Sequence, residues 1–85
     1  MAVSKVQHLK TDGQIEEIEI SEEDMLSALQ GLVGGLIEVV YNIGNMPDGK
    51  ILIVNEEGII HDLEPNPLVK GVVGNAVLMN RDDLK

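Results

Sequence analysis

Residues 34–58 read GGLIEVVYNIGNMPDGKILIVNEEG, and this stretch decides the fold. Two apolar runs rich in β-branched residues, 36–41 and 51–54, flank a segment dense in glycine, asparagine, proline and aspartate. β-Branched residues favour strands, whereas the residue types between the two runs favour turns. Residues 51–54 are apolar at every position, which is typical of a strand covered on both faces. The sequence therefore predicts that the two runs are the central strands of a small sheet.

Upstream of this stretch, the sequence predicts a β-hairpin. Residues 3–10 and 15–20 flank a turn that contains Asp12 and Gly13, a residue pair typical of tight hairpins. The second strand reads IEEIEI, and its alternation of apolar and charged residues is imperfect. Three glutamates within six residues discourage pairing with another chain, so we expect this strand to lie at an edge of the sheet.

One amphipathic helix is predicted between the hairpin and residue 34, over residues 22–32. Ser21 can cap its first turn, and the three acids that follow favour the positive end of the helix dipole. Apolar residues then recur at helical spacing, and the Gly34 and Gly35 pair ends the helix.

After residue 58 the pattern becomes short and broken. Residues 59–60 are expected to add a brief strand, and Asn66 is expected to cap a short helical turn over residues 68–70. Residues 76–79 form a last strand, and residues 80–85 are a polar tail that frays. The fold class is α+β, a single domain over residues 1–85. It comprises a hairpin, one helix and three to four further strands in a mixed or antiparallel sheet, by analogy with a β-grasp.

Size and charge restrict the partners of the chain. Eighty-five residues bury only roughly 60% of the unfolded surface, and without cysteines the chain has no disulfides to add stability. A homo-oligomer, with a dimer favoured, is therefore predicted. The net charge of −9 disfavours nucleic acid and anionic membranes as partners. No residue run resembles a signal peptide or a membrane span, so we expect a cytoplasmic protein.

The stretch around residues 34–58 resembles a family of small phage and Gram-positive bacterial proteins known as a domain of unknown function. The resemblance covers about residues 26–79 and rests on a glycine pair, an IEVV strand, an NEEG turn, a PN pair and a closing G-x-x-V-L strand. In this chain they are Gly34-Gly35, Ile37-Glu38-Val39-Val40, Asn55-Glu56-Glu57-Gly58 with Leu63, Pro65-Asn66, and Gly74 with Val77-Leu78. The family's segment after the PN pair is longer and helical, whereas Pro67, Gly71 and Gly74 interrupt it here.

Neither catalysis nor metal binding is predicted. Nucleophilic catalysis needs a nucleophile beside a base, and the serines stand in no such context relative to His8 or His61. His61 and Asp62 near Glu56 and Glu57 match no standard ligand spacing. We therefore expect no enzyme activity, no cofactor and no metal site.

Eight residues are candidates for binding a small molecule. Glu38 and the asparagines offer hydrogen bonds, Tyr41 offers the one aromatic ring, and three bases could meet a phosphate. Ordinary roles compete at every position, such as core packing for Tyr41 and solvent exposure for Glu38. The candidate ligand-binding residues are Glu38, Tyr41, Asn42, Lys50, Asn55, Asn66, Lys70 and Arg81.

Three functions remain open on this sequence. The resemblance implies a phage protein, and by association a counter-defence sponge that sequesters a nucleotide-derived signal of bacterial immunity, in the host cytoplasm. The alternative is an acidic module that inhibits a basic host enzyme or DNA-binding protein through Glu16, Glu17, Glu19, Glu22, Glu23 and Asp24. A structural domain with no separable activity is the third.

Overall fold

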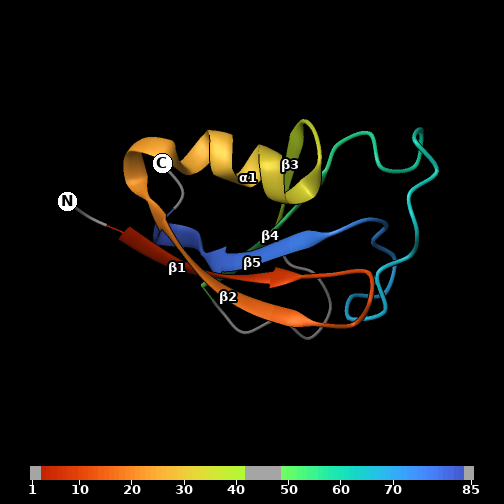
Figure 1. Ribbon diagram of the computed structural model, residues 1–85, viewed down its shortest axis with the longest axis horizontal. Helices are drawn as coiled ribbons and strands as arrows, with labels where there is room; N and C mark the ends of the chain where they lie inside the picture. Colours follow the sequence, from red (N-terminus) through yellow and green to blue (C-terminus); the bar gives the residue numbers. More distant parts are fainter. Residues whose placement is uncertain (1–2, 42–48, 84–85) are drawn as a thin grey trace.

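Five strands form one antiparallel sheet in the order β2-β1-β5-β4-β3, and a single α-helix lies across one of its faces (Figure 1). The computed structural model describes residues 3–41 and 49–83. The elements are β1 Val3–Leu9, β2 Ile15–Ser21, the 3₁₀ turn Glu22–Asp24, α1 Met25–Val33, β3 Ile37–Val40, β4 Lys50–Asn55, β5 Ala76–Asn80 and the 3₁₀ turn Arg81–Asp83. The α+β class with an initial hairpin is thus confirmed, and all four strand pairings are antiparallel.

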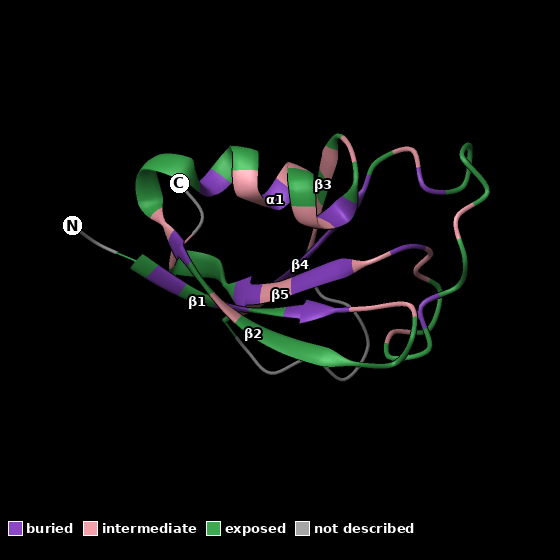
Figure 2. Cartoon of the chain, viewed as in Figure 1, coloured by how far each residue is buried: buried purple, intermediate pink, exposed green. Residues whose placement is uncertain are grey.

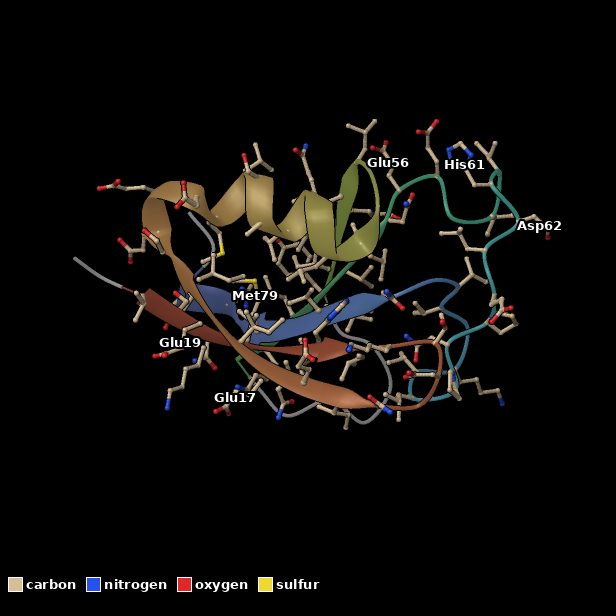
Figure 3. The ribbon with its side chains drawn as sticks, in the orientation of Figure 1. Glu17, Glu19, Glu56, His61, Asp62 and Met79 are labelled. Atoms are coloured by element: carbon tan, nitrogen blue, oxygen red, sulfur yellow. The ribbon has the colours of Figure 1, made fainter. Side chains whose placement is uncertain are left out.

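The main core lies between α1 and the sheet. Met25, Leu29 and Val33 follow one another at intervals of four residues, so they form one stripe along the helix, and all three are buried. This stripe belongs to one cluster with apolar side chains from all five strands, among them Val6 of β1. Met79 of β5 belongs to the same cluster and is labelled in Figure 3. Figure 2 shows the same division by colour, with the buried side of the helix turned to the sheet.

A long segment, residues 56–75, covers the part of the opposite face that lies over β4 and the adjoining strand ends, whereas Lys5 of β1 and Glu17 and Glu19 of β2 stay exposed on that face. Val69 and Val72 of this segment pack against a second apolar cluster that includes Leu52 and Val54 of β4. β4 is therefore buried from residue 51 to residue 55, which confirms the expectation of a strand covered on both faces.

The hairpin and the helix were predicted closely, but the helix starts differently. β2 does lie at one edge of the sheet and carries the three glutamates there. The α-helix begins at Met25 and not at residue 22, because Glu22–Asp24 form a 3₁₀ turn. The Ser21 side chain makes no capping hydrogen bond. Gly34 ends the helix in the left-handed conformation, at φ 82°, as its position predicted.

The prediction that residues 36–41 form a central strand is wrong. β3 is the edge strand opposite β2, and the central strand is β5, which pairs with β1 on one side and with β4 on the other. The helix carries the chain from one edge across the sheet to the other, so the strand that follows it starts a new edge. β4 is the interior strand that the sequence predicted.

Two expectations about residues 56–75 also need correction. Residues 59–60 form no strand; they lie in a series of turns closed by hydrogen bonds from the His61 amide to the Glu57 carbonyl and from Asp62 to Ile59. Asn66 does cap the next turn, since its side-chain oxygen accepts the Leu68 amide at 2.9 Å, but the turn does not become a helix. Residues 76–79 are strand as predicted, and the tail continues as a 3₁₀ turn to Asp83.

Candidate functional site

A groove lies on the face of the sheet that α1 does not cover, between β3 and the long segment 56–75. We call it the β3 groove. Its cavity volume is about 290 Å³, and it is lined by Glu38, Val40, Val54, Asn55, Glu56, Gly58, Ile59, Ile60, Lys70, Gly71, Val72 and Val73. Three stretches of sequence that the chain separates by many residues thus meet here.

The alternation of side chains along the strands explains the floor of the groove. Glu38 and Val40 point to one face of β3, and their partners across the ladder are Val54 and Leu52. Val54 belongs to the apolar cluster of this face, and Val40 packs against that cluster. The floor is therefore apolar, and Glu38 is the one charge that β3 contributes.

The wall of the groove is unusually apolar for an exposed turn. Ile59 is 85% exposed and Ile60 is 77% exposed, although burying such a side chain is worth roughly 1.5–3 kcal/mol. The wall turns back at Gly58, where an added Cβ would lie 2.8 Å from a Val73 methyl carbon. Glycine at residue 58 therefore lets the two sides of the segment approach each other.

The charges of the groove have mixed sign. Glu38, Glu56 and Lys70 are all exposed and line it, so two carboxylates face one ammonium. Figure 3 shows Glu56 near the start of the long segment, with His61 and Asp62 farther along. Against a chain of net charge −9, this balance disfavours a ligand with several negative charges.

Of the eight predicted site residues, Glu38, Asn55 and Lys70 meet in this groove. Asn55, however, is used by the fold. Its side-chain nitrogen donates to the Val33 carbonyl at 3.1 Å, and its oxygen accepts the Glu57 amide at 2.8 Å. Asn55 thereby ties the end of α1 to the end of β4 and shapes the groove from beneath.

Asn66 is likewise used by the fold, and it lies outside the groove. It is buried, and its nitrogen donates to the carbonyls of Leu9 and Gly74, both at 3.0 Å. These bonds fix the long segment to the end of β1. Asn66 therefore holds in place the chain that builds the groove wall.

The remaining candidates lie elsewhere. Tyr41 follows β3 and is 50% exposed, and the Arg81 guanidinium lies over its ring at 5.2 Å from the centroid. Lys50 begins β4 opposite Asn80, at the end of the strand away from Asn55. Asn42 lies outside the described residues. Tyr41, Lys50 and Arg81 do not line the β3 groove.

The histidines have structural partners. His8 is buried, and its Nε2 lies 3.1 Å from the Leu32 carbonyl, to which it donates. His61 lies 3.7 Å from a Glu57 carboxylate oxygen on the surface. Within residues 3–41 and 49–83, no three side chains of the metal-binding types converge. None of the described helices has the length and apolar character needed to cross a membrane.

The acidic residues form a second feature of the surface. Glu16, Glu17, Glu19, Glu22, Glu23 and Asp24 are all exposed along β2 and the turn after it. Glu17 and Glu19 project from β2 away from the helix (Figure 3). Glu16 is bound to Lys10 at 3.2 Å.

Sequence reasoning missed the apolar lining of the groove. Val72 and Val73 stand between two glycines, and Ile59 and Ile60 follow a turn, so both pairs read as short strands or as loop. The usable signal was a pair of large aliphatic residues inside a turn-rich stretch, where polar residues are expected.

The described residues form a small α+β domain with a mostly apolar groove beside its edge strand β3. The chain belongs to the family described as Domain of unknown function (DUF3846), whose model matches residues 4–84. Neither the curated proteins nor the solved structures include a significant match to the chain.

Proposed function

We propose that this chain is a non-enzymatic binding protein that holds its ligand in the β3 groove. The observation that carries the proposal is the apolar groove itself, in which side chains from β3, β4 and the long segment converge around Glu38 and Lys70. Binding sites are concave and mostly apolar, with a few convergent polar groups that orient the ligand.

The groove favours a ligand with an apolar body and a polar group of little net charge. Val40, Val54 and Val72 would contact the body, while Glu38 would accept hydrogen bonds from hydroxyl or amide groups. Lys70 would meet a single anionic group.

A nucleotide-derived immune signal, the ligand of a phage counter-defence sponge, is the most specific version of this proposal. Its phosphate would have to bind Lys70 in the presence of Glu38 and Glu56. Tyr41 and Arg81 lie outside the groove, so stacking on Tyr41 would require a ligand that reaches beyond it. A ligand with one phosphate suits this charge balance better than one with several.

Thermal unfolding with a ligand panel tests the proposal. The panel contains cyclic mononucleotides, cyclic dinucleotides, ADP-ribose-type nucleotides, and neutral nucleosides and amides. A ligand present at 100 times its Kd stabilises the folded state by about 2.7 kcal/mol, which raises the Tm measurably. Far-UV circular dichroism follows the transition, because the chain has no tryptophan.

Two variants locate the binding. Lys70→Glu reverses the one basic group of the groove and should abolish the shift for a phosphate-bearing ligand. Lys5→Glu makes the same charge change on the exposed side of β1, two strands away from β4, and should leave the shift intact. If no member of the panel raises the Tm, the small-ligand proposal fails.

The second candidate is the acidic inhibitor, which the exposed acids of β2 and the following turn favour. Changing Glu16, Glu17, Glu19, Glu22 and Glu23 to Gln should weaken binding to a basic test protein, and added salt should weaken it in the unchanged chain. Binding that is insensitive to both changes would rule this candidate out. A negative result in both experiments would favour the third alternative, a structural domain with no separable activity.

A further inference from the structure

We propose that β3 pairs with β3 of a second copy, so that two sheets join and two β3 grooves lie side by side. This inference rests on the proposed function, because the second copy would supply the missing side of the same groove. β3 is the last strand of the described sheet, so no strand lies beyond Glu38 and Val40.

The composition of β3 is that of an interior strand. Its neighbourhood reads LIEVVY, with apolar residues on both faces and one charge. Leu36 is 54% exposed, and Ile37, Val39 and Val40 are only half-buried. Edge strands usually carry charges or proline to prevent pairing, as β2 does with its glutamates. β3 has a single charge, Glu38, and no proline, and a neighbouring strand would cover its apolar side chains.

The backbone of β3 is arranged for such pairing. The Glu56 amide donates to the Leu36 carbonyl at 2.8 Å, so alternate residues from Leu36 direct their backbone groups toward β4. Ile37 and Val39 therefore direct their N–H and C=O groups outward. Within the described residues no strand accepts them.

Charge selects the register. Two-fold antiparallel pairing that keeps three residue pairs within β3 can be centred on Glu38 or on Val39, whereas centring on Ile37 keeps only one such pair. Centring on Glu38 would place two carboxylates directly opposite each other, which is destabilising. Centring on Val39 places Glu38 opposite Val40 of the second copy, and Tyr41 opposite Ile37 of the second copy.

The resulting interface is self-complementary, as a two-fold interface must be. An antiparallel pairing keeps the same face of both sheets on the same side, so the two grooves form one trough. Each groove contributes an acid, Glu38, and a base, Lys70, to this shared face. The second copy's Glu38 and Val40 extend the floor of the first groove.

Sedimentation equilibrium tests the proposal by mass. The expected species at high micromolar concentration has twice the 9.2 kDa mass of one chain. Because both copies carry a net charge of −9, we expect dimerisation to strengthen with salt, as the Debye length falls from about 30 Å at 0.01 M to about 8 Å at 0.15 M. Binding of a basic partner to the acidic surface should instead weaken as salt is added, because salt screens the attraction between opposite charges.

Val39→Pro tests the location. Proline is tolerated on an edge strand at a residue whose backbone N–H would point outward, so the monomer should fold. Because proline has no N–H, each of the two copies loses the hydrogen bond that the Val39 amide would donate to the other. We expect the dimer dissociation constant to rise about tenfold or more, since each lost hydrogen bond is worth roughly 1 kcal/mol. Leu26→Gln, which changes an exposed apolar residue on α1 without altering the net charge, is the control and should leave dimerisation unchanged.

Hydrogen exchange of the unchanged chain supplies a test that needs no variant. The amides of Ile37 and Val39 should exchange more slowly as concentration rises, and those of β2 should not. A monomer at every concentration and salt, or a dimer without this protection, would overturn the proposal. Ligand binding by a stable monomer would overturn this inference alone, whereas a β3-paired dimer that binds no ligand would overturn only the proposed function.

Discussion

The two edges of the sheet differ in almost every respect. β2 has seven residues, pairs with β1 along its whole length, and carries three exposed glutamates. β3 has four residues, one glutamate and apolar side chains on both faces. One edge is thus protected by charge against further strands, and the other is compatible with pairing and adjoins the β3 groove. The charged edge and the apolar edge that adjoins the groove therefore lie on opposite sides of one small sheet.

The largest effect is expected from a substitution in the main core, on which both edges of the sheet depend. Leu29 is fully buried on the side of α1 that faces the sheet and packs in the main core. Leu29→Ala should lower the free energy of unfolding by about 2–5 kcal/mol, through lost transfer energy and the cavity left behind. Urea unfolding followed by circular dichroism measures it, and hydrogen exchange should show that β2 and β3 lose protection alike. Loosening of only one edge would contradict a shared core.

A smaller loss of stability, confined to the β3 side of the sheet, is expected from a substitution at Asn55. Asn55→Ala removes the hydrogen bonds to the Val33 carbonyl and from the Glu57 amide, both on the β3 side. We expect a loss of about 1–3 kcal/mol, because at least one buried polar group is left without its partner. Exchange should accelerate for β3 and residues 56–58, while the β1–β2 hairpin stays protected. Equal acceleration in β2 would show that the edges are not independent.

The long segment 56–75 gives a comparable prediction. Gly74 has φ 80°, and an added Cβ would lie 2.7 Å from a Leu63 methyl carbon. Gly74→Ala should therefore destabilise the protein by about 1–3 kcal/mol and disturb the long segment. Gly71→Ala has the same backbone strain, at φ 87°, but no atom within 4 Å of the added Cβ. The difference between the two variants isolates the steric contact, and equal losses would show that strain alone acts.

The smallest effect on stability concerns the protected edge. Changing Glu17 and Glu19 of β2 to Gln should alter the free energy of unfolding by no more than about 0.5 kcal/mol, because both side chains are exposed. The variant should nevertheless self-associate more readily through β2. Light scattering measures this, and Asp82→Gln with Glu64→Gln, which changes the net charge equally at exposed residues outside β2, is the control. No increase beyond that control would mean that the glutamates do not protect this edge.

Local patterns predicted the elements well. Each of three local patterns indicates a single type of element. They are the Asp12 and Gly13 turn, the stripe of apolar residues along α1 and the uninterrupted apolar run of β4. Strand order was harder, because the apolar composition of β3 indicates an interior position that the single chain does not provide. The apolar composition of a strand indicates that its side chains favour burial, but it does not specify which neighbouring strand buries them.

The candidate site was predicted only in part, for a related reason. Glu38, Asn55 and Lys70 were chosen for their chemistry, and the fold brings them together. Asn55 and Asn66 have the residue type of a ligand-binding group, but their amides are used by distant backbone groups of the chain itself. Such long-range hydrogen bonds leave no periodic signal in a sequence, and neither does the folding of residues 56–75 onto β4.

The contact between Tyr41 and Arg81 has a practical consequence. Tyr41 is the sole aromatic residue of the protein, and it stands directly after β3 with a guanidinium over its ring. All near-ultraviolet absorption and intrinsic fluorescence from side chains therefore originates at one known point of the molecule. The chain carries a built-in optical probe at the end of the strand where a second copy or a ligand would arrive, and no label is needed to read it.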